Sequence, residues 1–294
     1  MEMVLEWLKA VLYGIIEGIT EWLPVSSTGH LILIQDLIPF SFTDDAALLA
    51  EYSEMFQVVI QLGAIFAVVV LFWHRLWPFS KRKTPTEKRN TWALWGKVIV
   101  ASIPAALIGI VGDKLLEKAS GKDIDGWLYN SLVVAAALIV YGIAFTVIER
   151  FQKGRMAKTE AVEDVTLKDA LLIGCFQALS IVPGTSRSGS TILGSMLLGL
   201  SRTAAAEFCF FMAIPAMVGA SGIKALGFFA YISEEAVTVP ATAWVTLAIG
   251  CLVSFAVSMV AIRFLMDFVK KHSFSVFGVY RIALGLLVLL WWLL

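Results

Sequence analysis

The feature that most constrains this chain is a series of apolar runs about as long as a membrane is thick. A helix needs about 20 apolar residues to cross the ~30 Å hydrocarbon core of a bilayer. Six runs reach or approach that length: 56–73, 92–112, 128–148, 207–231, 242–266 and 274–294. Hydrophobic residues make up 59% of the 294 residues and charged residues only 16%, which excludes a water-soluble enzyme. We predict an all-α polytopic membrane protein with six transmembrane helices.

Four further apolar pieces come in two pairs, 3–24 with 28–40 and 169–182 with 189–200. Three of the four are too short to cross a bilayer at 1.5 Å per residue. We therefore predict two re-entrant helical hairpins, whose tips are candidate functional sites because only protein or a water-filled cavity can satisfy their backbone. Acidic residues interrupt the first piece and no small-residue cleavage site follows it, so we expect no cleaved signal peptide.

The charges of the loops predict an orientation, because Lys and Arg are retained on the cytoplasmic side. Segments 74–90 and 149–168 are rich in Lys and Arg and are expected to be cytoplasmic, together with the Lys270–Lys271 turn. Segments 41–55 and 232–243 contain neither residue, and 112–126 mixes three Lys with four acids. These three loops are expected to face outward.

The order of the predicted hairpins and crossings predicts an inverted-topology repeat of two halves, 1–150 and 151–294. Each half contains one hairpin and three crossings, and an odd number of crossings reverses the second half. Four positions match at an offset of 160 residues: Gly14 with Gly174, Glu17 with Gln177, Ser26 with Ser186, and Gly29 with Gly189. The two polar tips are then expected to meet inside the bilayer.

The first tip, residues 17–30, is a dense polar cluster in an apolar context. Glu17 and Glu21 share one helix face, and one acidic residue at the centre of a membrane helix costs about 2.5–3.5 kcal/mol. Two carboxylates this close need a cation. Pro24 ends the helix, and the hydroxyls that follow are suited to cap the next one and to leave N–H groups for an anion: Ser26, Ser27 and Thr28.

A structural interpretation of this tip remains open. The hydroxyls would then only cap helix 28–40, and the two Glu would be interfacial anchors. His30 is either a satisfied core histidine or, three residues after Ser27, a partner of that hydroxyl.

The second tip, Pro183–Thr191, is a Gly-rich turn lined by hydroxyls and carrying Arg187. Gly184 and Gly189 allow close backbone approach, and a guanidinium offers paired donors to phosphoryl oxygens. The turn is not a Walker loop. In the alternative interpretation, Arg187 lies at the cytoplasmic interface or pairs structurally with Glu17 or Glu21.

Other polar residues in the apolar runs carry weaker signals. Gln57 and Gln61 either line the same cavity or join helices. Two arginine-containing pairs either support the site or anchor the interface: Arg202 with Glu207, and Tyr280 with Arg281.

At these two tips the sequence resembles the bacterial undecaprenyl pyrophosphate phosphatase family, also called bacitracin-resistance proteins. The motif (E/Q)xxxE corresponds to Glu17 and Glu21, Leu-Pro-Val-Ser-Ser-Thr-Gly-His to 23–30, and PGxSRSxxT to 183–191. Similarity extends along 58–63 and 201–208. The resemblance implies a multi-pass enzyme of the bacterial inner membrane that recycles the lipid carrier of cell-wall peptidoglycan synthesis, which bears on cell shape and confers bacitracin resistance. It also implies a divalent cation, Mg²⁺ or Ca²⁺, and an active site that faces the periplasm.

The predicted catalytic residues are Glu17, Glu21, Ser27, His30 and Arg187, with the cation held by Glu17 and Glu21. Ser27 attacks the terminal phosphorus while His30 or Glu21 accepts its proton, or Glu21 activates water directly. The predicted substrate-binding residues are Ser26, Thr28, Gln61, Gly184, Thr185, Ser186, Ser188 and Thr191.

A transporter or flippase of a lipid phosphate or another anion is the rival hypothesis, because secondary carriers share this architecture. A hybrid that hydrolyses the lipid and helps it return across the membrane also remains open, whereas a scaffold leaves the buried charges without purpose. The expected partners are a polyprenyl pyrophosphate lipid and the bilayer, and a homodimer is left open. Lys plus Arg and Asp plus Glu both number 23, so no net charge favours nucleic acid.

Overall fold

The computed structural model describes residues 2–121, 127–128 and 130–293, and these residues form helices and loops with no β-strand beyond one isolated bridge between Thr159 and Leu200. The α-helices are α1 (Glu2–Thr20), α2 (Ser27–Leu37), α3 (Ala46–Val59), α4 (Gln61–Leu71), α5 (Trp73–Leu76), α6 (Pro85–Leu107), α7 (Asp113–Ser120), α9 (Ser131–Gln152), α10 (Leu167–Ala178), α11 (Arg187–Leu197), α12 (Arg202–Glu234), α13 (Ala241–Lys271) and α14 (Ser275–Leu293).

Six helical segments of the described residues are long and apolar enough to cross a membrane. They are Ala46–Leu71, Pro85–Ser120, Ser131–Gln152, Arg202–Glu234, Ala241–Lys271 and Ser275–Leu293. Each predicted crossing overlaps one of them. The described residues confirm the prediction of an all-α protein with six helices long and apolar enough to span a membrane.

The predicted loops 41–55 and 112–126 were wrong in part, and the predicted Lys270–Lys271 turn is the end of α13. Segment 41–55 contains the start of α3, whose N-cap Asp45 accepts hydrogen bonds from the backbone N–H groups of Ala47 and Leu48. Glu51 and Glu54 interrupt the apolar pattern, so the apolar run begins only at residue 56. Ala and Leu at the start of α3 nevertheless favour a helix. In segment 112–126, a π-helical turn at Ile108–Gly112 leads from α6 into α7, and residues 122–126 lie outside the described part.

Two pairs of consecutive helices lie where the hairpins were predicted. α1 ends four residues before Pro24, which cannot donate a backbone hydrogen bond, and α2 starts after a short turn. α10 and α11 form the second pair. α2, α10 and α11 have 11, 12 and 11 residues, and at 1.5 Å per residue each is only about 17 Å long. Three of the four helices are therefore too short to cross a bilayer, as predicted.

The chain forms two compact units that interleave along the sequence. The first unit contains residues 1–22, 30–71 and 213–263, and the second contains residues 23–29, 72–212 and 264–294. Both polar turns, 23–29 and 183–191, belong to the second unit, whereas Glu17, Glu21, His30 and Gln61 belong to the first.

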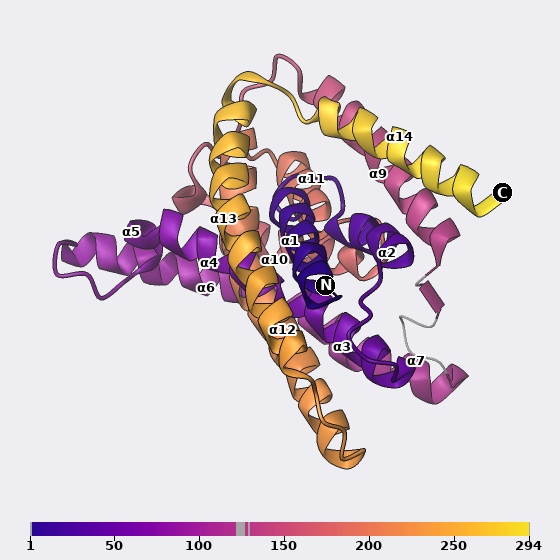
Figure 1. The fold of residues 1–294 in the computed structure, drawn as a ribbon. Coiled ribbons are helices and arrows are strands. Elements are labelled where there is room, and N and C mark those ends of the chain that lie inside the picture. The colour runs from indigo at the N-terminus through magenta and orange to yellow at the C-terminus, as the bar shows by residue number, and fades with distance from the viewer. Residues whose placement is uncertain (1, 122–126, 129, 294) are drawn as a thin grey trace. The chain divides into compact units, whose positions relative to one another are not determined.

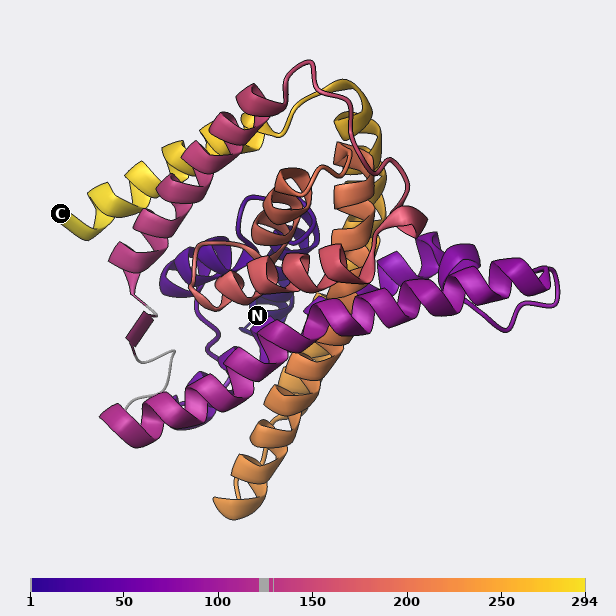
Figure 2. The same cartoon turned by 180° about the vertical axis from the view of Figure 1, so that it is seen from behind.

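Small residues let helices approach closely in the second unit. α9 and α14 lie side by side in both views (Figures 1 and 2), and a Cβ on Gly142 would lie 2.6 Å from the carbonyl oxygen of Gly278. α10 packs on α6, where a Cβ on Gly174 would overlap the carbonyl oxygen of Ala101. Such backbone contacts at small residues are typical of packing between membrane helices.

The first unit contains a matching contact between α1 and α13. A Cβ on Gly14 would lie 2.8 Å from the carbonyl oxygen of Gly250. Gly14 and Gly174 are one of the pairs that match at an offset of 160 residues. Gly14 packs α1 against α13, and Gly174 packs α10 against α6.

Buried carboxylates connect elements that are distant in sequence. In the second unit, Glu149 is 4% exposed and accepts hydrogen bonds from Arg202 Nε at 2.9 Å, Arg202 Nη2 at 2.6 Å and the backbone N–H of Phe274 at 2.7 Å. In the first unit, Glu6 accepts from Lys9 Nζ at 2.6 Å and from Ser41 Oγ at 2.9 Å. These bonds hold α9 to α12 and to the start of α14, and α1 to the segment after α2.

Candidate active site

The two polar turns of the second unit share an unusual local conformation. Ser26 has a φ of +74° and Ser186 a φ of +67°, in the left-handed region that residues other than glycine rarely adopt. Each serine then caps the helix that follows: Ser26 Oγ accepts from the backbone N–H of Gly29 at 3.3 Å, and Ser186 Oγ from that of Gly189 at 3.1 Å. Backbone strain of this kind concentrates at functional sites.

The second turn presents the N-terminus of α11. Arg187 and Ser188 are the first residues of the helix, and Ser188 Oγ lies 3.0 Å from Ser186 Oγ. Gly184 has a φ of +91°, and a Cβ there would lie 2.6 Å from the carbonyl oxygen of Val134, so only glycine fits. Backbone N–H groups at a helix start, serine hydroxyls and a guanidinium together suit an anion with several oxygens. We call residues 184–189, the turn before α11 and the first three residues of that helix, the anion cradle.

Two predicted substrate-binding hydroxyls stabilise the turn itself. Thr185 Oγ1 donates to the carbonyl of Val182 at 2.7 Å, and Thr191 Oγ1 donates to the carbonyl of Arg187 at 2.8 Å. Both side chains are buried. The half-buried Arg187 donates from Nη1 to the carbonyl of Cys209 on α12 at 3.1 Å, so the guanidinium rests on a helix from another part of the sequence.

The first turn contacts the second turn directly. Ser188 Oγ donates to the carbonyl of Leu23 at 3.4 Å. Arg281 of α14 donates to the carbonyls of Pro24, Gly184 and Thr185, and so touches both turns. From the sequence, Arg281 either supports the site or anchors the interface, and its side chain is fully buried in the structure. The available signal was an arginine in the middle of an otherwise apolar run.

The predicted carboxylates are buried on α1 and just after its end. Glu17 is 0% and Glu21 6% exposed, and the backbone N–H of Glu21 donates to the carbonyl of Glu17 at 3.0 Å. This helical bond keeps the two side chains one turn apart on the same face. Ser27 and His30 are the first and fourth residues of α2, so they too share one face of a helix. Ser27 is buried and His30 is half-buried.

The two carboxylates are a donor set that fits a divalent cation with open positions. Within residues 2–121, 127–128 and 130–293, no group of three or more His, Cys, Asp or Glu side chains surrounds a metal-sized point. A closed, all-protein metal cage is therefore not what the described residues build. Mg²⁺ is usually bound by one or two carboxylates together with water and substrate phosphates. Glu17 and Glu21 match that pattern.

The two glutamines of the predicted cavity lie in the first unit. Gln57 hydrogen-bonds through Nε2 to Gln35 Oε1, which joins α3 to α2. Gln61 is the half-buried first residue of α4, a helix that contacts α1. Gln57 therefore joins helices, and the substrate-binding role of Gln61 stays a prediction.

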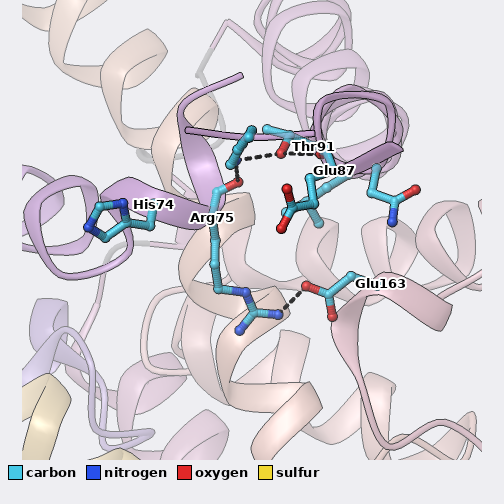
Figure 3. A pocket seen from close by; sticks show the side chains of 8 residues that line it. His74, Arg75, Glu87, Thr91 and Glu163 are labelled. Atoms are coloured by element: carbon cyan, nitrogen blue, oxygen red, sulfur yellow. Dashed lines mark hydrogen bonds and ion pairs between the residues drawn. The ribbon is translucent and has the colours of Figure 1, made fainter. Parts of the chain in front are cut away.

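A separate pocket lies around α5 and the start of α6 in the second unit (Figure 3). It has a volume of about 220 Å³ and includes no residue of either motif among those that line it: His74, Arg75, Lys83, Glu87, Asn90, Thr91, Leu94 and Glu163. Arg75 reaches Glu163 at 2.5 Å and Glu207 at 2.6 Å. Desolvation alone would lower the pKa of Arg75, but the hydrogen bonds and charges of these two carboxylates outweigh it and raise the pKa. These ion pairs of Arg75 join α5 to α12 and to the segment before α10.

Comparison with known proteins gives one consistent result. A model of the family described as "Bacitracin resistance protein BacA" matches residues 10–287. The chain is 50% identical over 289 residues to an undecaprenyl-diphosphatase of Enterococcus faecalis, with 97% of each chain covered. It is 47% identical over 291 residues to an undecaprenyl-diphosphatase of Acetivibrio thermocellus, with 99% of each chain covered. A third undecaprenyl-diphosphatase, from Lactiplantibacillus plantarum, is 49% identical over 286 residues, which cover 97% of this chain and 98% of that protein.

Proposed function

This chain belongs to the bacitracin resistance protein BacA family, and we propose that it is the membrane phosphatase that converts undecaprenyl diphosphate to undecaprenyl phosphate and inorganic phosphate. The single observation that carries this conclusion is about 50% identity over almost the whole chain to proteins named for that reaction. The strained turns at Ser26 and Ser186 support it, because each caps a helix and the second turn builds the anion cradle among apolar helices.

We propose that the anion cradle binds the diphosphate group of the substrate. Backbone N–H groups at the start of α11 and the Arg187 guanidinium donate hydrogen bonds to phosphoryl oxygens. Negative charge on these oxygens must be neutralised before a nucleophile can approach phosphorus. The prenyl tail lies among the apolar faces of the membrane-spanning helices.

The nucleophile in this proposal is Ser27. Its Oγ attacks the terminal phosphorus while His30, one helical turn away on α2, or Glu21 accepts the hydroxyl proton. The bond from phosphorus to the bridging oxygen breaks, and undecaprenyl phosphate leaves with that oxygen. Water then hydrolyses the phosphoserine to release inorganic phosphate. In the alternative route Glu21 activates water directly, and no phosphoserine forms.

Glu17 and Glu21 are the residues that would hold Mg²⁺ or Ca²⁺. Their burial and their spacing of one helical turn support this assignment. When bound, such a cation neutralises negative charge on the phosphoryl oxygens. His30 and Arg187 do not depend on it for their proposed roles.

We further propose that the two helix pairs are re-entrant hairpins of an inverted repeat, in a protein of the bacterial inner membrane with its active site facing the periplasm. The matched caps of Ser26 and Ser186 and the matched close contacts of Gly14 and Gly174 support the repeat. The Lys- and Arg-rich segments 74–90 and 149–168 support the orientation.

The experiment is release of phosphate from undecaprenyl diphosphate by the purified chain in detergent. Arg187→Ala is the test variant, and Arg263→Ala is its matched control, because Arg263 is an exposed arginine of the membrane-spanning helix α13. We expect release by the unmodified protein and by Arg263→Ala, and its loss in Arg187→Ala. No release by well-folded unmodified protein would favour transport of a lipid phosphate instead.

A further inference from the structure

Arg281 connects the two polar turns through backbone carbonyls. Its Nη1 donates to the carbonyl of Pro24 at 3.1 Å, and its Nη2 donates to the carbonyls of Gly184 at 2.6 Å and Thr185 at 2.8 Å. The first carbonyl precedes Ser26, and the other two belong to the turn that leads into α11. A guanidinium is a planar, rigid set of donors. One rigid group therefore hydrogen-bonds to both turns and restricts the distance between them.

Gly189 explains how the guanidinium reaches the anion cradle. A Cβ on Gly189 would lie 2.8 Å from Arg281 Nη1, closer than ordinary van der Waals contact allows. Gly189 is the third residue of α11, so Arg281 passes directly against the first turn of that helix. On another side, the Arg281 guanidinium carbon lies 5.4 Å from the centre of the Tyr141 ring, and Tyr141 Oη lies 3.0 Å from Ser190 Oγ. The guanidinium is thus held in place by residues on both sides of it.

The charge of Arg281 has no carboxylate partner in the part of the chain that the structure describes. None of the ion pairs there includes Arg281, and its buried Nε makes no hydrogen bond to those residues. Burying a cation without an opposite charge is costly. An anion bound at the first turn of α11 would supply negative charge beside it.

We propose that Arg281 is a positioning residue for the phosphatase reaction. It holds the hydroxyl-bearing turn at Ser26 and Ser27 at a fixed distance from the anion cradle, and its charge favours binding of a diphosphate there. This inference rests on the proposed function and adds a residue outside both sequence motifs.

Two substitutions separate the positioning effect of Arg281 from the effect of its charge. Arg281→Met removes the donors and the charge, whereas Arg281→Lys keeps the charge but replaces the planar set of donors by a single ammonium. A displacement of about 1 Å at a reacting centre can lower turnover about 100-fold. We expect Arg281→Met to lower kcat about 100-fold and to weaken inhibition by inorganic phosphate. We expect Arg281→Lys to restore the phosphate inhibition constant to near that of the unmodified protein while kcat stays at least about tenfold low.

The experiment measures kcat and KM for undecaprenyl diphosphate, the inhibition constant of inorganic phosphate, and thermal unfolding, all with the full chain in detergent. Arg263→Met is the control, since it removes an exposed arginine from a membrane-spanning helix. Gly189→Ala is the second variant, because it leaves Arg281 in the chain but takes the space that Nη1 occupies.

The outcomes separate this inference from the proposed function. Without phosphate release by the unmodified protein, the proposed function is wrong. With normal release, kcat values of folded Arg281→Met and Arg281→Lys within twofold of the unmodified protein would overturn the positioning role, as would equal loss of phosphate binding in both. If neither variant folds, Gly189→Ala decides: a folded variant with lowered kcat supports the role, and one with full kcat overturns it.

Discussion

The close contact between α10 and α6 leads to a prediction about how the anion cradle is held. In the variant Gly174→Ala, the new Cβ would overlap the carbonyl oxygen of Ala101 in α6. That oxygen is part of a backbone and cannot rotate away, so the two helices must separate by on the order of 1 Å to restore van der Waals contact. α10 precedes the turn that carries Arg187, and the displacement passes to the cradle.

The magnitude follows from two opposing contributions. Overpacking costs about 1–3 kcal/mol, and we take the upper end because the overlap is with backbone. Alanine in place of glycine in a helix interior stabilises by about 1 kcal/mol. The free energy of unfolding should therefore fall by about 2 kcal/mol in Gly174→Ala. Turnover should fall by up to about 100-fold if the cradle moves by about 1 Å.

Gly96→Ala is a matched control for this variant. Gly96 lies in α6, and a Cβ there would meet no other atom within 4 Å. This variant should keep full turnover and gain up to about 1 kcal/mol, so the two variants should differ by about 3 kcal/mol. The assays are unfolding by SDS in mixed micelles and phosphate release from undecaprenyl diphosphate. Equal stability and equal turnover of the two alanine variants would refute the argument from helix packing.

Three further predictions concern the metal, the nucleophile and a buried ion pair. EDTA should abolish phosphate release and added Mg²⁺ restore it, whereas Glu17→Gln and Glu21→Gln should each need more Mg²⁺ for half-maximal activity; an unchanged requirement would contradict the metal assignment. Acid-quenched enzyme should retain labelled phosphate and Ser27→Ala should not, while full activity of Ser27→Ala would favour the direct-water route. Glu149→Ala should lower the free energy of unfolding by about 3 kcal/mol, because it leaves a buried N–H without a partner and breaks a hydrogen-bonded pair, and Glu163→Ala, which removes a half-exposed pair, by less than about 1 kcal/mol.

The class of the protein follows from its amino-acid sequence alone. Six apolar runs predicted six membrane-spanning helices, because crossing a bilayer depends on the length and polarity of one continuous segment. The caps at Ser26 and Ser186 were also predictable, since a helix start is a local property of a few neighbouring residues. The start of α3 at Ala46 was not predicted, because Glu51 and Glu54 interrupt the apolar run there.

Which distant residues support the motif residues becomes visible in the folded protein. Arg281 and Pro24 are 257 positions apart, and nothing in either neighbourhood predicts their hydrogen bond. The same holds for Glu149 with Phe274 and for Gly174 with Ala101, which meet only after the helices pack. A hydropathy pattern indicates only whether a segment lies in water or in an apolar environment. Which buried polar groups satisfy one another depends on how the helices are arranged.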